Sequence, residues 1–257
     1  MIKTVDSLRV AAFVVVLLSV VAVSGLTGAA QQPSGWTPQQ TIPDYHPETE
    51  PPHLIADQNR TVHAFSYQWL SEDEGQAERA IVYNQWTLYG GWTTPVDVVL
   101  SPIKQDARLL GAILDQTGMM HVLFFGGDDT EANVYYSQAP AVRADRATAW
   151  SEPVLLGEQA ITPENGGIAG DDKGNLVAVY SGDLEKHGFY AIYSRDRGHT
   201  WSEPEPVFAT FDQQMWPAYL RMYLGESGWL HAMWTVNDIA NHGQAIYYAR
   251  FDFAAMQ

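Results

Sequence analysis

The chain has 257 residues, of which 46% are hydrophobic and 17% charged, and it contains no cysteine. This composition predicts a globular protein with a sizeable core, and it excludes disulfides and a thiol nucleophile. The formal net charge of -16 would repel phosphate backbones, so nucleic acid is excluded as a partner.

The first 30 residues differ from the rest of the chain. Lys3 and Arg9 precede an uncharged apolar run, residues 10–30, which ends in the small residues Gly28, Ala29 and Ala30. This pattern predicts a secretion signal that is cut near Ala30. A retained membrane anchor is the alternative, because about 20 apolar residues can span a bilayer. Residues 31–257 are expected to form a single domain that is secreted or extracytoplasmic, with a membrane partner only if the segment is retained.

Four segments repeat one pattern, in which a short apolar run, a turn and a second apolar run follow each other: residues 54–67, 112–125, 168–181 and 222–235. Their turns open at Asp57, Asp115, Asp171 and Gly225. Asp-x-x-Gly between two apolar runs predicts a hairpin, since Gly supplies positive φ. A third apolar run follows each segment, at residues 80–83, 133–136, 191–194 and 245–248. A fourth run, with Trp followed by Pro, begins at Gly91, Ala149 and Thr200, and a similar run begins at Gly35.

Each unit is therefore expected to be a four-stranded antiparallel sheet, as in a propeller blade, with its Trp-Pro strand at the outer edge. The fourth unit has no Trp-Pro strand after its third run, whereas a spare one lies near Trp36. We predict an all-β fold, a β-propeller of four four-stranded antiparallel blades, closed by the N-terminal strand completing the last blade. A fragment of a larger ring is the alternative.

The stretch YSRDRGHTW places Ser194, Asp196, Gly198, Thr200 and Trp201 between the third and fourth runs of the third unit. Asp196 can accept backbone N–H bonds across the turn, Gly198 can take the left-handed conformation, and Trp201 can pack between sheets. These residues resemble the Asp-box, or BNR repeat, of the sialidase-like β-propellers. In that family the box marks the fold and lies away from the active site, so the resemblance implies a structural role for the five residues.

The resemblance to sialidases would also imply three arginines that bind the sugar carboxylate, a Tyr paired with Glu as nucleophile, and an Asp as acid and base. The first arginine normally lies in an Arg-Ile-Pro triplet, which this sequence lacks. Arg108 and Arg221 begin inner strands and are candidates for the central channel. Glu164 and Asp212 form a candidate carboxylate pair, with Asp183 as a further candidate, because glycoside cleavage uses two such groups about 5 to 10 Å apart.

Four carboxylates recur at intervals of 55 residues in the loops between second and third runs: Asp73, Asp128, Asp183 and Asp238. Around one mouth they would suit Ca²⁺, which takes oxygen ligands, or sugar hydroxyls. The alternative is that turns are rich in Asp. Trp216 and Tyr45 are candidates for a flat sugar platform, or for buried aromatic plugs. No other cofactor is expected.

Three histidines occupy the same position in three units: His63, His121 and His231, with Val177 in the remaining one. Three imidazoles at one height could ligate a metal. The alternative is a half-buried histidine that is hydrogen-bonded to a neighbouring blade.

These features favour an exported, acidic propeller that acts as a non-catalytic binding or scaffold module for a glycan or protein partner. A glycoside hydrolase that uses Glu164, Asp212 or Asp183 with Arg221 is the second hypothesis. A membrane-tethered subunit of an envelope complex is the third, if residues 10–30 are retained.

Overall fold

The computed structural model describes residues 35–45, 49–70, 78–104, 106–128, 131–160, 165–210 and 214–256. The chain divides into two compact units, residues 1–41 and 42–257. Residues 35–41 of the first unit carry a turn and irregular backbone, and the predicted signal segment lies outside the described residues. Among the described residues, no helix has the length and apolar character needed to cross a membrane.

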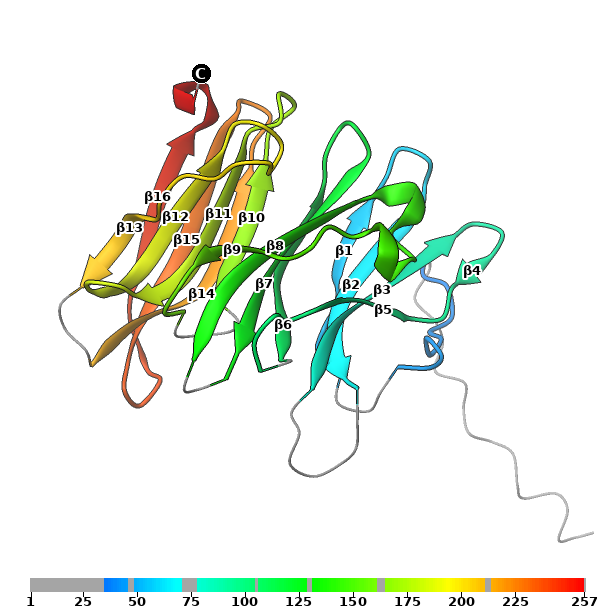
Figure 1. The fold of residues 1–257 in the computed structure, drawn as a ribbon, viewed down its shortest axis with the longest axis horizontal. Coiled ribbons are helices and arrows are strands. Elements are labelled where there is room, and N and C mark those ends of the chain that lie inside the picture. Colours follow the sequence, from blue (N-terminus) through cyan, green and yellow to red (C-terminus); the bar gives the residue numbers. More distant parts are fainter. Residues whose placement is uncertain are drawn as a thin grey trace, which may run out of the picture. The chain divides into compact units, whose positions relative to one another are not determined.

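The second unit is built from antiparallel sheets that pack on one another in chain order (Figure 1). The first sheet contains β1 (His53–Ala56), β2 (Val62–Trp69), β3 (Arg79–Thr87), β4 (Gly91–Trp92) and β5 (Val96–Leu100). The second contains β6 (Ala107–Leu114), β7 (Met119–Gly127), β8 (Ala132–Pro140) and β9 (Val154–Gly157). The third contains β10 (Gly166–Gly170), β11 (Leu176–Asp183), β12 (His187–Ser194) and β13 (Glu205–Thr210). The last contains β14 (Met215–Leu224), β15 (Trp229–Asp238) and β16 (Gly243–Asp252).

The prediction of an all-β chain with four antiparallel sheets is confirmed. The only helical turns among the described residues are three 3-10 elements, η1 (Ala141–Arg143), η2 (Ala147–Ala149) and η3 (Phe253–Met256). In the first sheet the Trp-Pro run splits into β4 and β5, which both pair with β3 on either side of Pro95. Pro has no N–H to donate, so the ladder is interrupted there.

The last sheet differs from the prediction, because its described part has three strands rather than four. Residues 35–41, from which ring closure is predicted, are assigned no strand. The structure therefore does not show the sheet completed by this segment, and closure of the ring stays a prediction.

Three separate cores lie between successive sheets. Phe65 of the first sheet contacts Trp150, in the connection between β8 and β9 of the second sheet, with 5.8 Å between ring centroids. Tyr136 of the second meets Trp201 at 4.9 Å, and Phe189 of the third meets Trp234 of the last at 5.8 Å. Burial of such rings is the main apolar contribution to stability.

The outer side of the first sheet is covered by the segment that precedes β1. Tyr45 Oη donates to Asn84 Oδ1 at 2.8 Å, and Ser66 Oγ donates to the Glu50 carbonyl at 2.5 Å. Asn84 and Ser66 are both buried. Tyr45 is thus half-buried, with its hydroxyl engaged by Asn84.

The inner strands pack closely through glycine. A Cβ on Gly111 of β6 would lie 3.2 Å from Gly167 Cα of β10, and one on Gly167 would lie 2.9 Å from Met222 Cε of β14. Across from them, desolvation lowers the pKa of His53 of β1, and the charge of Arg221 of β14 lowers it further. The first strands of the sheets therefore lie near one another, as expected of a propeller-like arrangement.

Candidate functional site

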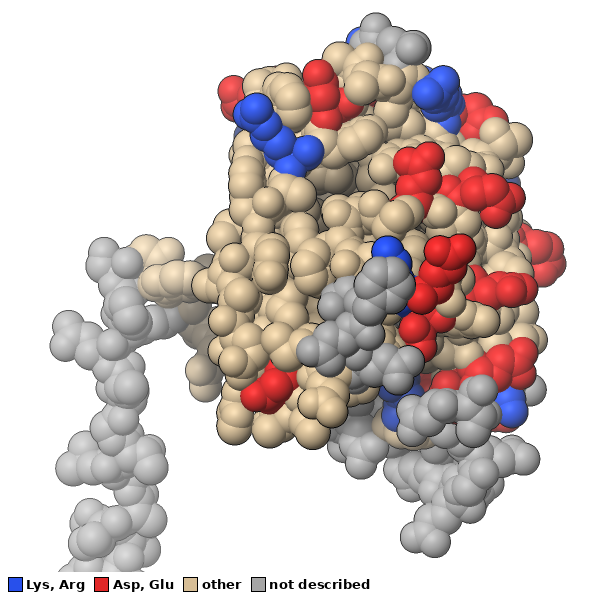
Figure 2. All heavy atoms as spheres, turned by 90° about the vertical axis from the view of Figure 1, so that its left-hand side faces the viewer, with Lys and Arg blue, Asp and Glu red and all other residues tan. Residues whose placement is uncertain are grey.

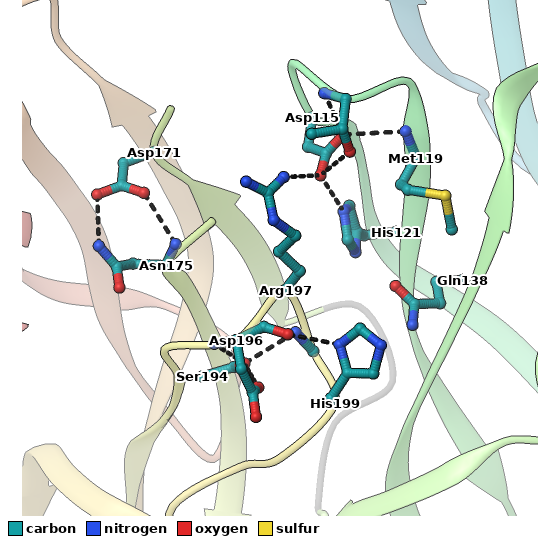
Figure 3. Close-up of polar contacts among 12 residues, drawn as sticks. Asp115, Met119, His121, Gln138, Asp171, Asn175, Ser194, Asp196, Arg197 and His199 are labelled. Carbon is teal, nitrogen blue, oxygen red and sulfur yellow. Dashed lines mark hydrogen bonds and ion pairs between the residues drawn. The ribbon is translucent and has the colours of Figure 1, made fainter. Parts of the chain in front are cut away.

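The hairpin that resembles the Asp-box is held by its own side chains (Figure 3). Asp196 accepts the Thr200 hydroxyl at 2.6 Å and the Thr200 N–H at 2.8 Å, and these bonds lower the pKa of Asp196 to about 2. Gly198 has φ +84 and donates its N–H to Ser194 Oγ at 2.8 Å. Trp201 packs on Tyr136 of the second sheet. Every member is engaged within the fold, as the structural interpretation predicts.

The three repeated histidines do not converge on a common point. Each bonds to a tyrosine of its own sheet through Nδ1: His63 to Tyr83 at 2.7 Å, His121 to Tyr136 at 2.6 Å, and His231 to Tyr248 at 2.8 Å. In the described part of the chain, no group of three His, Asp or Glu side chains is placed to hold a metal. The hydrogen-bonded alternative fits these residues, with the partner on the same sheet rather than on a neighbouring blade.

An ion pair joins the second and third sheets near this hairpin. Arg197 Nη1 lies 3.6 Å from Asp115 Oδ2, and His121 Nε2 lies 3.4 Å from the same oxygen (Figure 3). Desolvation raises the pKa of Asp115, but hydrogen bonds from the Met119 N–H, Thr117 and His121 outweigh it, so the net shift is downward. Arg197 therefore links the third sheet to the second.

At the opposite ends of the strands, two of the recurring carboxylates fix their own turns. Asp238 accepts the N–H groups of Ala240 and His242, each at 2.9 Å, and Gln244 Nε2 at 2.8 Å. Asp128 accepts the Glu131 N–H at 3.1 Å and lies 3.7 Å from Lys104 Nζ. These contacts match the turn-residue alternative. Asp73 lies outside the described residues.

The proposed carboxylate pair cannot be placed, because Glu164 and Asp212 both lie outside the described residues. Arg221 of β14 is exposed, and its Nη1 donates to the Leu220 carbonyl at 2.8 Å. It is therefore the candidate arginine that remains accessible beside the axis.

Arg108, the other candidate arginine, is engaged by a buried carboxylate. Its Nη2 lies 2.9 Å from Asp106 Oδ2, and Arg79 Nη1 lies 3.4 Å from Asp106 Oδ1. The side chain of Asp106 is only 3% exposed, whereas those of both arginines remain partly accessible. Two guanidinium groups on one carboxylate leave one net positive charge at this end of the first two sheets.

An aromatic contact lies where the third and last sheets meet. The ring of Trp216 in β14 approaches His187 of β12 edge-on, with 5.3 Å between centroids. His187 Nδ1 lies 3.4 Å from Asp183 Oδ1, and the carboxylate of Asp183 is 41% exposed. Among the predicted site residues, the structure thus brings Trp216 and Asp183 together through His187.

Tyr219 lies on the same strand as Trp216 and was not predicted from the sequence. It is a non-glycine residue at φ +56, and it remains 56% exposed. Its N–H donates to the side chain of buried Asn165 at 2.6 Å, and its hydroxyl is 3.5 Å from Asn241 Nδ2. Left-handed backbone is costly for a tyrosine, and such strain often marks functional positions. We call Asn165, Asp183, His187, Trp216, Tyr219 and Asn241 the loop-end patch.

A hollow of about 720 Å³ lies elsewhere, between the outer parts of the second and third sheets. It is lined by Glu158, Glu185 and Glu203 beside Lys186 and Trp201. On the face of the molecule drawn in Figure 2, Asp and Glu cover more of the surface than Lys and Arg, in agreement with the net charge. None of the described residues that line the hollow is a non-glycine residue with a left-handed backbone. The loop-end patch, which contains Tyr219, is therefore the stronger candidate.

No family model matches the chain, and no curated protein does. Solved structures match it at low identity. An ulvanlyase bound to GlcA(1-4)Rha3S units is 12% identical with a TM-score of 0.53, over 79% of this chain and 51% of that one. A protein of unknown function from Dyadobacter fermentans is 15% identical with a TM-score of 0.57, over 84% and 65%. A variant of NanB sialidase from Streptococcus pneumoniae is 10% identical with a TM-score of 0.55, over 78% and 30%.

The chain thus has a sialidase-like, β-propeller-like fold, which is also found among polysaccharide lyases and a family-43 glycoside hydrolase. It spans about half of the ulvanlyase chain. At these identities the similarity concerns the fold alone.

Proposed function

We propose that the protein is a glycan-binding module and that the loop-end patch holds the sugar. The observation that carries this proposal concerns Tyr219. Its ring is exposed, its backbone is left-handed, and its N–H is bound by a buried asparagine. A flat aromatic ring beside amide and carboxylate groups can stack on a sugar face while its neighbours bond to hydroxyls. The occurrence of this fold in glycan-acting proteins agrees with the proposal.

A non-catalytic role is the form of this proposal that we favour. In the described part of the patch, Asp183 is the one carboxylate, and glycoside cleavage needs a pair. The carboxylates of Asp128 and Asp238 are occupied by turn hydrogen bonds. We further propose, from residues 1–30 of the sequence, that the module is exported; mass spectrometry of the mature N-terminus would show whether the segment is cut or retained as a membrane anchor.

Binding can be tested on a glycan array with the full chain, followed by calorimetric titration of the strongest ligand. Tyr219→Ala and Trp216→Ala should each weaken binding by about tenfold or more, because a contact worth 1.4 kcal/mol changes affinity tenfold. Tyr223→Ala is the matched control, since Tyr223 lies on the same strand and is 69% exposed but is not part of the patch. Equal losses in all three variants would contradict the assignment.

Catalysis can be tested separately with fluorogenic glycosides, sialosides included. The non-catalytic proposal predicts no turnover above the uncatalysed background. Turnover that Asp183→Asn abolishes would instead establish the glycoside hydrolase alternative.

A further inference from the structure

In the first three sheets, the third strand carries a fourth strand at its outer edge, and the attachment has one recurring chemistry. The N–H groups of Gln85, Gln138 and Tyr193 donate to a Thr or Ser hydroxyl of the fourth-strand segment, at 3.0, 3.1 and 3.1 Å. The same Thr93, Ser151 and Ser202 return their N–H groups to the carbonyls of these residues, at 2.9, 2.9 and 2.8 Å.

The sequence around this attachment also recurs. Trp precedes the Thr or Ser each time, and Pro follows two residues later: Trp92 to Pro95, Trp150 to Pro153 and Trp201 to Pro204. Trp150 and Trp201 then pack between their own sheet and the preceding one. A fourth strand is therefore held by a backbone ladder, a hydroxyl and a buried indole.

The last sheet has the third-strand half of this attachment, without a fourth strand in its described part. Gln85, Gln138 and Tyr193 lie opposite His63, His121 and Val177, and Arg250 of β16 lies opposite His231 in the same way. Tyr248 and Ile246 correspond to Tyr136 and Val134, which pair with β9. In the part of the chain that the structure describes, β16 pairs only with β15, so its ten residues present a free edge.

This edge has none of the protection found on the outer strands of the other sheets. Pro95 and Pro153 precede β5 and β9, and Pro206 lies within β13, whereas β16 contains no Pro and no Lys. Ile246 is 72% exposed and Tyr248 is 55% exposed. A long edge with exposed apolar side chains favours pairing with another strand.

A cavity lies where the indole of a fourth strand would enter. It measures about 270 Å³ and lies between the third and last sheets, with Ala191, Tyr193, Val207, Ala249 and Phe251 among its lining residues. Ala191 occupies the position that Tyr83 and Tyr136 fill in the first two sheets. The small side chain at this position leaves space that the large rings occupy elsewhere.

We propose that the free edge of β16 and this cavity form a docking site for an extended segment of a partner protein that carries Trp, then Ser or Thr, then Pro two residues later. The segment pairs antiparallel with β16, its hydroxyl accepts the Arg250 N–H, and its indole enters the cavity. This is β-strand addition, in which the ladder supplies affinity and the side-chain pocket supplies specificity. The site is independent of the loop-end patch.

The probe is a fluorescent peptide with the sequence of residues 200–208, TWSEPEPVF, titrated with the full chain and followed by anisotropy. Saturable binding is expected, and replacement of the peptide's Trp by Ala or of its Ser by Val should each weaken it by about tenfold or more.

The matched protein variants are Ile246→Pro and Ile246→Ala. The Ile246 N–H has the same outward direction as those of Tyr248 and Arg250, because direction alternates along a strand. Proline removes this N–H without breaking the ladder with β15, so Ile246→Pro should weaken binding by about tenfold, whereas Ile246→Ala should bind like the wild type. Circular dichroism confirms that both variants fold.

Two results would overturn the proposal. One is the absence of peptide binding to both the wild type and a full-length Trp36→Ala variant. The other is binding to Trp36→Ala alone, which would assign the edge to the ring closure predicted from the sequence. Tyr219 variants should leave peptide binding unchanged, so this test and the glycan test fail separately.

Discussion

The second and last sheets carry the same His-Tyr pair at the same position, but in different surroundings. His121 bonds to Tyr136 at 2.6 Å and His231 bonds to Tyr248 at 2.8 Å. Tyr136 is 1% exposed beneath the third sheet, whereas Tyr248 is 55% exposed. The pair therefore belongs to the repeating strand pattern, and the presence of a covering sheet determines how much the pair contributes to the free energy of unfolding.

The largest expected effect comes from removing the tyrosine ring. Tyr136→Ala should lower the free energy of unfolding by about 3–5 kcal/mol, because it leaves a cavity in a closed core and a buried His121 without its partner. Tyr248→Ala should cost less than about 1 kcal/mol, since its ring is already half in water. Urea titration of both variants measures the difference, and similar losses would show that the last sheet is covered in solution.

A pair of glycines tests the same contrast at the turns. A Cβ on Gly198 would overlap Tyr136 Oη, whereas one on Gly228 beside the last sheet would meet nothing within 4 Å. Both have positive φ, +84 and +81. Gly198→Ala should therefore cost about 2–4 kcal/mol, from backbone strain and overpacking, and Gly228→Ala only about 1 kcal/mol from strain. Thermal unfolding would reveal equal costs if the hairpin could move aside.

The buried histidine should also make stability depend on pH. Desolvation lowers the pKa of His121 from 6.5, although Asp115 opposes this shift. Below about pH 6.5 the unfolded chain binds more protons than the folded one, so stability should be constant above that pH and fall as the pH drops. Desolvation lowers the pKa of His63 as well.

Denaturant titrations from pH 8 to pH 5 measure this slope. His121→Gln should reduce it, and the additional change His63→Gln should reduce it further. An unchanged slope in the double variant would mean that the acid sensitivity arises elsewhere.

The smallest expected effect concerns the inner strands. Leu110 in β6 and Tyr219 in β14 both lie at a register shift, but Leu110 is buried and Tyr219 is exposed at φ +56. Tyr219→Gly should raise stability by about 0.4–1 kcal/mol by relieving this strain, while glycan binding is lost. Lower stability in Tyr219→Gly would show that the ring supports the fold.

The sequence was sufficient to predict the four sheets and their order, because apolar runs alternate with Asp-x-x-Gly turns at a regular spacing. The hairpin at Ser194 to Trp201 was also predictable, since its bonds are local. Contacts between sheets were not. Arg197 reaches Asp115 only because two sheets pack at a particular distance, and no local pattern specifies that distance.

The candidate site was predicted only in part. Trp216 and Asp183 were identified, but their meeting through His187 depends on how β12 and β14 lie together. Nothing in the sequence indicated Tyr219, because tyrosine seldom adopts positive φ and its N–H is bound by Asn165, which lies far away in the sequence, just before β10. A polar residue such as Asn165, buried at a strand end, is the sign that could have directed attention there.

The division of the apolar interior into three separate cores has a consequence for how the protein opens. Each sheet gains stability only from its immediate neighbours, so the molecule resembles a short linear array and loses order most easily from an uncapped end. At one end Tyr45 and Glu50 bond to residues of the first sheet, whereas β16 lies at the other. Amide hydrogens of β15 and β16 should consequently exchange with deuterium long before those of β7 and β11.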